Sequence, residues 1–292
     1  MPVSQRLCQM PPHPNVAALI ATHRREQLLM ERALPSVMSQ TWLPARVVVV
    51  DDGATLSGQT VSTLGRCTEL AVDLLRLDPA GGAAAAWNAG LRHLAAIEFD
   101  GFVAMLDDDD CWDADHLEAN VRVAVAEGAD IVVSGLRLWV GGRVVPRPVI
   151  DDLTPSMFLT GNPGWQGSNT FVSLSAMSRA GGFRAGLPSL NDRDLALRLL
   201  ALPGVCVGFT GRWTSTWFAD TPGALSEPGS VPKVRGLAAF WRIYAPTMSP
   251  AEKEAFFQRA ERLFVVPRAA VLAMADQIDL TAMLGVHHAP LE

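Results

Sequence analysis

The sequence predicts an α/β protein built on a mostly parallel β-sheet flanked by helices. Short apolar runs such as VAALIA (16–21) and RVVVV (46–50) alternate with longer segments whose apolar residues recur at helical spacing. The short runs are also unbroken, which is typical of parallel strands that are covered on both faces. Repeated strand–helix–strand units of this kind build a parallel sheet.

The expected elements follow one another from residue 16 to residue 140. We expect strands at 16–21, 46–50, 71–77, 101–106 and 129–140, and helices at 23–40, 57–70, 83–97 and 114–128. After residue 140 the pattern loosens, because Gly and Pro become frequent. A strand leading into a helix is expected at 167–182, a further helix at 191–202 and a linker at 220–232.

Capping residues indicate where the later helices begin. Asn191 or Asp192 is the expected N-cap of the helix at 191–202. Ser249, Pro250 and Glu252 form a favourable helix start near the C-terminus. The chain therefore divides into an irregular lead-in (1–14), an α/β domain (15–228) and a C-terminal helical segment (229–292). Core packing is the main expectation for this last segment. The alternatives are that the segment packs on the ligand side of the domain or that it forms a homodimer contact.

Composition excludes several functional classes. The chain has 292 residues, is 49% hydrophobic and carries a formal net charge of −6, so it suits a globular protein and not a nucleic-acid binder. The four cysteines are scattered and indicate reduced thiols. No apolar run is long enough for a membrane span, and the first residues lack the apolar segment of a signal peptide. We therefore expect a cytoplasmic protein without integral membrane association.

Four consecutive aspartates, Asp107 to Asp110, directly follow the apolar run at 101–106. Alone, such a cluster reads as an acidic turn that caps the next helix. Its place at the carboxyl end of a buried strand favours another interpretation, since ligands bind there in open α/β sheets and unpaired buried charge is costly. Oxygen ligands suit a hard cation, so the pattern predicts Mn²⁺ or Mg²⁺.

Other polar residues follow the first two strands. Thr22, His23 and Arg24 follow the first strand, and Asp52 with Gly53 follows the second. Each group has an ordinary structural interpretation, as a helix cap or a turn. Asp192 and Asp194 begin a later helix, where they either favour the helix dipole or supply a general base.

Taken together, these segments resemble the family-2 glycosyltransferases of the GT-A fold, a Rossmann-like architecture. The resemblance runs from about Val16 to Ser226 and is carried by five segments in order. They are ATHRR, LPSVMSQTWLPARVVVVDDGA, GGAAAAWNAG, LDDDD and LNDRD.

The resemblance implies a metal-dependent, inverting transfer of one sugar from a nucleoside-diphosphate sugar, most commonly of UDP, to an acceptor hydroxyl. The acceptor would be a polysaccharide precursor or a small natural product. Asp109 is implied as the metal ligand and Asp192 as the base, with Asp194 as its rival. The implied donor-binding residues are Thr22, His23, Arg24, Asp52, Gly82, Asn88, Asp107 and Asp108, and the sugar and acceptor pocket would contain Trp165, Gln166, Ser168 and Asn169.

Two departures from the family pattern keep alternatives open. Trp87 replaces the usual Arg, and Asn191 replaces the acidic residue before the base, which makes Asp194 a rival to Asp192. The structural interpretation of 165–169 is a well-packed strand end. The other functions considered are a sugar-1-phosphate nucleotidyltransferase, disfavoured because ATHRREQLLM has no Gly, and a non-catalytic nucleotide-sugar-binding protein.

Overall fold

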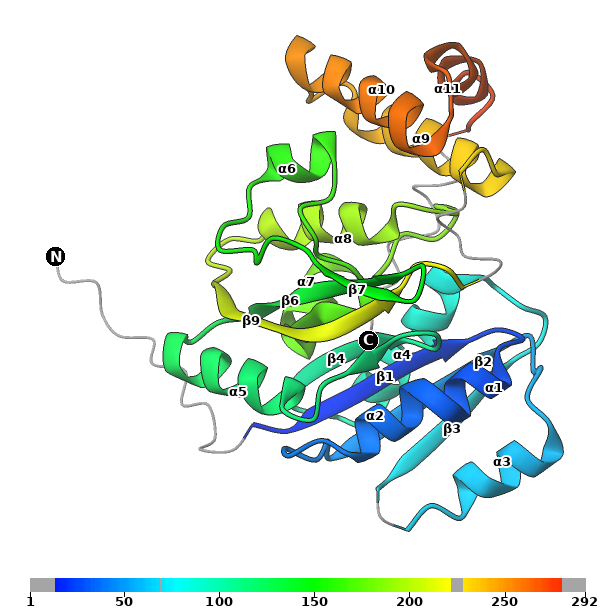
Figure 1. Cartoon of the computed structure of the whole chain (residues 1–292), viewed down its shortest axis with the longest axis vertical. Helices are drawn as coiled ribbons and strands as arrows, with labels where there is room; N and C mark the ends of the chain where they lie inside the picture. Colours follow the sequence, from blue (N-terminus) through cyan, green and yellow to red (C-terminus); the bar gives the residue numbers. More distant parts are fainter. Residues whose placement is uncertain (1–13, 69, 222–227, 280–292) are drawn as a thin grey trace, which may run out of the picture.

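A computed structural model describes residues 14–68, 70–221 and 228–279 (Figure 1). The described chain forms a nine-stranded sheet with helices on both faces. Along the sheet the strands are β3 (Val72–Leu77), β2 (Arg46–Asp52), β1 (Val16–Thr22), β4 (Phe102–Asp107), β8 (Thr170–Ser173), β6 (Ile131–Val140), β9 (Val207–Phe218) and β5 (Cys111–Trp112), with β7 (Arg143–Pro146) paired to β6.

Parallel order is confined largely to the first half of the sheet. Strands β3, β2, β1 and β4 are all parallel, whereas β8 runs antiparallel to both of its neighbours. The expected α/β class is confirmed, and the complete sheet is mixed. Val47 to Val50 of β2 are fully buried, which explains why this strand is an unbroken apolar run.

Alternate residues of each central strand enter different layers. In β1, Ala17 and Leu19 pack with α4 (Ala83–Ala96), α7 (Leu174–Ala180) and α8 (Asn191–Leu200). Val16, Ala18 and Ile20 point to the other face. That face is covered by η1 (Leu29–Ala33), α2 (Leu34–Met38), α3 (Gly58–Gly65) and α5 (His116–Glu127), with α1 (Glu26–Leu28) leading into η1. Two apolar layers therefore hold the strand ends in register.

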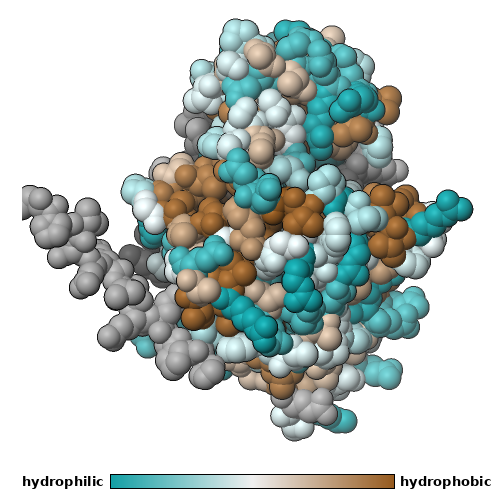
Figure 2. Space-filling view, turned by 60° about the vertical axis from the view of Figure 1, so that its left-hand side comes forward, coloured by the Kyte–Doolittle hydropathy of each residue, from teal (hydrophilic) through white to brown (hydrophobic). Residues whose placement is uncertain are grey.

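The C-terminal helices α9 (Val231–Tyr244), α10 (Pro250–Phe264) and α11 (Arg268–Ala275) lie above the sheet domain in Figure 1. Phe240, Phe256 and Phe257 are buried and belong to the same core as α4 and α8. Helix α10 packs on α6 (Pro155–Thr160). On the face drawn in Figure 2, mainly hydrophilic residues cover this upper part and apolar residues gather below it. The helices thus bury their aromatic face against the sheet domain.

Some local expectations need correction. The N-cap of α8 is Leu190, in a left-handed conformation, so Asn191 and Asp192 lie inside the first turn. Strands β5, β7 and β9 and helix α6 are absent from the sequence interpretation. The capping box of Ser249 and Glu252 is confirmed. The lead-in up to residue 13 and residues 222–227 of the linker lie outside the described residues.

No helix in the described ranges has both the length and the apolar character needed to cross a membrane. Cys67, Cys111 and Cys206 are free thiols. The expectation of unpaired cysteines therefore holds for the three cysteines in the described part of the chain.

Gly101 is expected to be required at the start of β4. Its φ is +149°, and an added Cβ would lie 2.2 Å from the Asn15 carbonyl oxygen. Gly101→Ala should lower the free energy of unfolding by about 1–3 kcal/mol, because the strained backbone and the fixed oxygen leave no room for a methyl group. Urea unfolding measures this loss. Gly65→Ala, with nothing within 4 Å of its added Cβ, should be neutral or slightly stabilising.

Candidate active site

Three parallel strands end at one edge of the sheet. Thr22 is aligned with Asp51, and Ala21 is aligned with Asp107. A cavity of about 330 Å³ lies at this edge. It is lined by Ala21, Thr22, His23, Arg25, Asp52, Ala80, Gly82, Ala83, Trp87, Asp107 and Asp108. The strand ends therefore bring together most of the residues predicted to bind the donor nucleotide.

Asp108 and Asp109 share one cation, Arg25. Arg25 Nη1 lies 3.2 Å from Asp108 Oδ1 and 2.9 Å from Asp109 Oδ2. Thr22 donates its hydroxyl to Asp108 at 2.8 Å. Burial, together with the charges of Asp109 and Asp108, raises the pKa of Asp107 to about 7. One guanidinium therefore does not offset the negative charge gathered at the end of β4.

Asp110 has a different environment from its three neighbours. Its carboxylate accepts hydrogen bonds from the Ser168 hydroxyl at 2.5 Å and from the backbone N–H of Phe218 at 2.9 Å. It is 1% exposed. Burial raises its pKa, and the charge of Asp107 adds to that effect. Asp110 thus joins the end of β4 to the short helix η2 (Gly167–Asn169) and to β9, and the four aspartates are not equivalent.

The carboxylates next to the cavity fit a divalent cation in one particular way. Within the described ranges, no group of three or more His, Cys, Asp or Glu side chains has the arrangement of a metal site. Mg²⁺ and Mn²⁺ commonly use one or two carboxylates together with water and ligand phosphates. The oxygen ligands of Asp107 to Asp109 and their excess negative charge suit that mode. Any such cation would have to share Asp109 with Arg25.

Asp52, the last residue of β2, contacts the loop that leads into α4. Its carboxylate accepts hydrogen bonds from the N–H groups of Gly81 (2.7 Å) and Gly82 (2.9 Å). Its carbonyl oxygen accepts a hydrogen bond from His23 Nδ1. The Gly82 N–H is therefore already paired, and Asp52 fixes the loop that forms one wall of the cavity.

Several predicted ligand-binding residues are engaged within the protein instead. Arg24 has φ +58° and does not line the cavity, where Arg25 lies instead. The Asn88 amide exchanges two hydrogen bonds with the Phe183 backbone, which ties α4 to the loop before α8. Neither residue lines the cavity that brings together the other predicted donor-binding residues.

The 165–169 segment is packed as a strand end. Trp165 is 2% exposed and meets Phe158 edge to face, so its ring has no open face for a sugar. Ser168 and Asn169 are fully buried, and the Asn169 amide bonds to the Ser134 and Gly164 carbonyls. Gln166 is half-buried and forms a reciprocal cap with Asn169. The structure thus buries three of the four residues predicted to line the sugar and acceptor pocket, and the Ser168 hydroxyl bonds to Asp107 and Asp110.

Asp192 lies in the first turn of α8 and is half-buried. The Asn162 amide donates to its Oδ2 at 2.5 Å, and the Arg193 N–H donates to its Oδ1 at 2.9 Å. Burial raises the pKa of Asp192 despite these bonds and the nearby charges of Arg193 and Lys233. The result is a positioned carboxylate that retains a proton at higher pH than an ordinary aspartate.

Asp194 is fully buried and saturated with partners. Arg184 and Arg198 each lie 2.8 Å from its carboxylate, and the Tyr244 hydroxyl donates to it at 2.7 Å. Burial alone would raise its pKa, but Arg198 and Arg184 outweigh burial and hold that pKa below its usual range. These contacts join α8 to α9, so Asp194 acts in the fold.

Two functional residues escape the sequence interpretation. Arg25 is adjacent to the predicted Arg24, and a left-handed Arg24 is what turns Arg25 toward the aspartates. Asn162 lies in the Gly- and Pro-rich stretch at 141–190, where no periodicity marks it. Its Oδ1 accepts hydrogen bonds from the N–H groups of Gly164 and Trp165, which fix the amide against Asp192.

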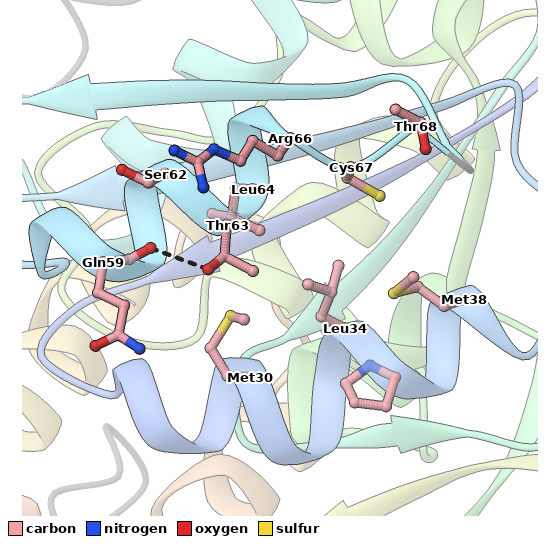
Figure 3. A pocket seen from close by; sticks show the side chains of 11 residues that line it. Met30, Leu34, Met38, Gln59, Ser62, Thr63, Leu64, Arg66, Cys67 and Thr68 are labelled. Atoms are coloured by element: carbon pink, nitrogen blue, oxygen red, sulfur yellow. Dashed lines mark hydrogen bonds between the residues drawn. The ribbon is translucent and has the colours of Figure 1, made fainter.

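A larger hollow of about 650 Å³ lies between the η1–α2 segment and α3 (Figure 3). Met30, Leu34 and Met38 line one side, and Arg66 and Cys67 lie on the other. The described residues that line it include no Asp, Glu or His. Since no paired acid or base lines it, size alone does not make this hollow a candidate active site.

Substitution of Asp194 and of Asp192 by asparagine should have opposite effects on stability. Asp194→Asn should cost about 3–5 kcal/mol of unfolding free energy at neutral pH, because two buried guanidiniums lose their partner. This cost should shrink as the pH falls through the depressed pKa of the folded carboxyl, since wild-type Asp194 is then protonated. Asp192→Asn should preserve or raise the melting temperature. Equal losses in thermal unfolding would contradict this division.

Both the sequence and the fold match known proteins. The family model for glycosyl transferase family 2 matches residues 18–181. The succinoglycan biosynthesis protein ExoW of Rhizobium meliloti (strain 1021) is 33% identical over 103 residues, which are 35% of this chain and 31% of that relative. This chain thus aligns with about a third of the length of ExoW.

Solved structures share the fold. TarS 1-349 of S. aureus in complex with UDP-GlcNAc has a TM-score of 0.65 at 17% identity, covering 91% of this chain and 76% of that chain. The mannosyltransferase PcManGT from Pyrobaculum calidifontis, in complex with GDP-Man and Mn²⁺, has a TM-score of 0.58 at 19% identity, covering 92% and 75%. With the family model matching more than half of its residues, this protein belongs to glycosyl transferase family 2.

Proposed function

We propose that the protein transfers one sugar from a nucleoside-diphosphate sugar to an acceptor hydroxyl, with inversion at the anomeric carbon and with Asp192 as the general base. The observation that carries this proposal is the contrast between the two carboxylates of α8. Asp192 is half-buried, has a raised pKa and is held by Asn162, whereas Asp194 is buried and paired with two arginines.

The proposed chemistry needs a proton acceptor next to the attacking oxygen. An Asp192 carboxylate oxygen takes the proton from the acceptor hydroxyl while the hydroxyl oxygen forms a bond to the anomeric carbon. The bond between that carbon and the nucleoside diphosphate breaks, and the diphosphate leaves with the bonding electrons. Asn162 holds the carboxylate in one orientation, which lowers the cost of aligning it.

Donor binding is proposed at the cavity between β1, β2 and β4. Asp52 and Thr22 support the base and ribose side, and Asp107 and Asp108 face the same cavity. A bound Mn²⁺ or Mg²⁺ would be held by Asp109 with help from Asp107 or Asp108, and it would neutralise the charge of the leaving diphosphate. Arg25 places a fixed positive charge beside these carboxylates.

The donor is proposed to be a UDP-sugar. TarS was solved with UDP-GlcNAc, which supports a uridine nucleotide, whereas PcManGT was solved with GDP-Man and Mn²⁺. A thermal-shift comparison of UDP, GDP and dTDP, each with and without Mn²⁺, tests the base and the metal together. The largest stabilisation is expected for UDP with Mn²⁺.

Asp192→Asn should retain UDP affinity and lose turnover by about 10²–10⁴-fold, because the amide cannot accept the proton. In the wild type, kcat/KM should fall as the pH drops through a pKa that is raised above the ordinary aspartate range. Product formation measured across pH checks both statements.

The exposed Asp152→Asn is the matched control, since it removes a carboxylate outside the proposed site. Loss of turnover in a fully folded Asp194→Asn variant, with Asp192→Asn still active, would overturn the assignment of the base. Release of pyrophosphate from a nucleoside triphosphate and sugar 1-phosphate would instead indicate a nucleotidyltransferase, and binding without any donor hydrolysis would indicate a non-catalytic binder.

Asp109→Ala should remove the dependence of UDP affinity on Mn²⁺, because it deletes the proposed metal ligand. Calorimetric titration of UDP with and without Mn²⁺ measures this dependence. Asp115→Ala removes another acidic residue of the same loop, one that pairs with the exposed Arg212, and should leave the dependence intact. An unchanged Mn²⁺ effect in Asp109→Ala would refute the role of this residue.

A further inference from the structure

A cavity of about 520 Å³ lies between α6 and α10, and Asn162 forms part of its lining. The same Asn162 donates a hydrogen bond to Asp192. The cavity therefore adjoins the carboxylate that is proposed to activate the acceptor. It is separate from the donor cavity at the strand ends, with which it shares no lining residue.

Arginine charges gather at this cavity. Arg259 and Arg262 of α10 line it. Burial lowers the pKa of Arg259, and the charges of Arg147 and Arg262 lower it further, which indicates that both guanidiniums lie near Arg259. The attractive charge acting on Arg259 is that of Asp192. The cavity thus combines several like charges in a chain whose net charge is −6.

These arginines are not neutralised by close partners. Within residues 14–68, 70–221 and 228–279, the side chains of Arg147, Arg259 and Arg262 have no ion pair or hydrogen bond. By contrast, Arg25 is paired with Asp108 and Asp109, and Arg198 is paired with Asp194. A half-buried Arg259 that is repelled by two neighbouring guanidiniums is stabilised by an anion.

The end of α6 lies next to Arg259. A Cβ added to Gly161 would lie 3.5 Å from Arg259 Nη1, so this guanidinium rests against the loop that carries Asn162. Arg259 is half-buried, which restricts its movement. Guanidinium groups hold phosphate through paired hydrogen bonds, and a doubly charged phosphate offsets more of this charge than a single carboxylate does.

We propose that this cavity binds a phosphate group of the acceptor through Arg259 and Arg262, with Arg147 adding positive charge behind them. The acceptor is then a hydroxylated molecule with a phosphate monoester or diester, and its free hydroxyl reaches Asp192 while the phosphate is held by α10. This inference rests on the proposed function and names its acceptor class. It also gives the C-terminal helices a part in substrate selection.

Glycerol 3-phosphate is a suitable probe, used with the full chain saturated with UDP and Mn²⁺ so that the donor cavity is filled. Calorimetry should show that the wild type binds this probe and not glycerol. Arg259→Gln and Arg262→Gln should each weaken binding by about tenfold or more, because each removes charge-assisted hydrogen bonds. Arg66→Gln removes an arginine from the separate hollow of Figure 3 and should bind as the wild type does.

Unchanged affinity in both α10 variants would overturn the proposal. Lactate is a hydroxylated anion with a carboxylate in place of the phosphate, and lactate binding as tightly as glycerol 3-phosphate would also overturn it. Thermal unfolding of each variant checks folding, and no loss of stability is expected since these side chains lack partners in the described structure. UDP affinity is measured separately. A wild type that binds no nucleotide refutes the proposed function, and the binding of glycerol 3-phosphate can still be interpreted by itself.

A vesicle-binding experiment distinguishes a lipid-borne phosphate from the phosphate of a soluble acceptor. Vesicles of phosphatidylcholine with and without phosphatidic acid are sedimented with the wild type and with Arg259→Gln. Binding that needs both phosphatidic acid and Arg259 supports a lipid-borne phosphate on the acceptor. Binding of glycerol 3-phosphate with no sedimentation supports a soluble phosphorylated acceptor.

Discussion

The end of β4 gathers more negative charge than the fold can leave unpaired, and much of the site is arranged around that constraint. Each aspartate is treated differently. Asp108 and Asp109 share Arg25, whereas Asp110 is held by the Ser168 hydroxyl and the Phe218 N–H. Asp107 retains a raised pKa because nothing fully offsets its burial. The remaining negative charge is what suits this strand end to a cation, through which a diphosphate is proposed to bind.

A second charge arrangement supports the proposed base. Asp194 is locked by two arginines and by Tyr244 of α9, so α8 is tied to the C-terminal helices. The first turn of α8 then places Asp192 against Asn162, which lines the cavity between α6 and α10. The paired Asp194 therefore anchors the helix that carries the proposed base, Asp192. The same contacts explain why helices outside the α/β domain influence the site.

Much of the architecture could be predicted from the sequence. Unbroken apolar runs identified β1, β2 and β4, because strands buried on both faces exclude polar side chains. The order of elements then placed the polar residues at one edge of the sheet. Strands β7 and β9 escaped prediction, since β7 is exposed along its whole length, while β9 is exposed from Gly211 to Trp213 and buries the polar residues Thr214 to Thr216, so neither presents a buried apolar run.

The sequence by itself determined which strand ends carry carboxylates, because covalent order and burial fix where an apolar run stops. It could not determine the partner of each side chain. Only the tertiary structure turned Arg25 in place of Arg24 toward the aspartates, buried Trp165 and Ser168, and separated Asp192 from Asp194. The physical reason is that these choices depend on contacts between residues far apart in the chain, such as Asn162 with Asp192 and Tyr244 with Asp194. A local pattern of charges carries no record of such contacts.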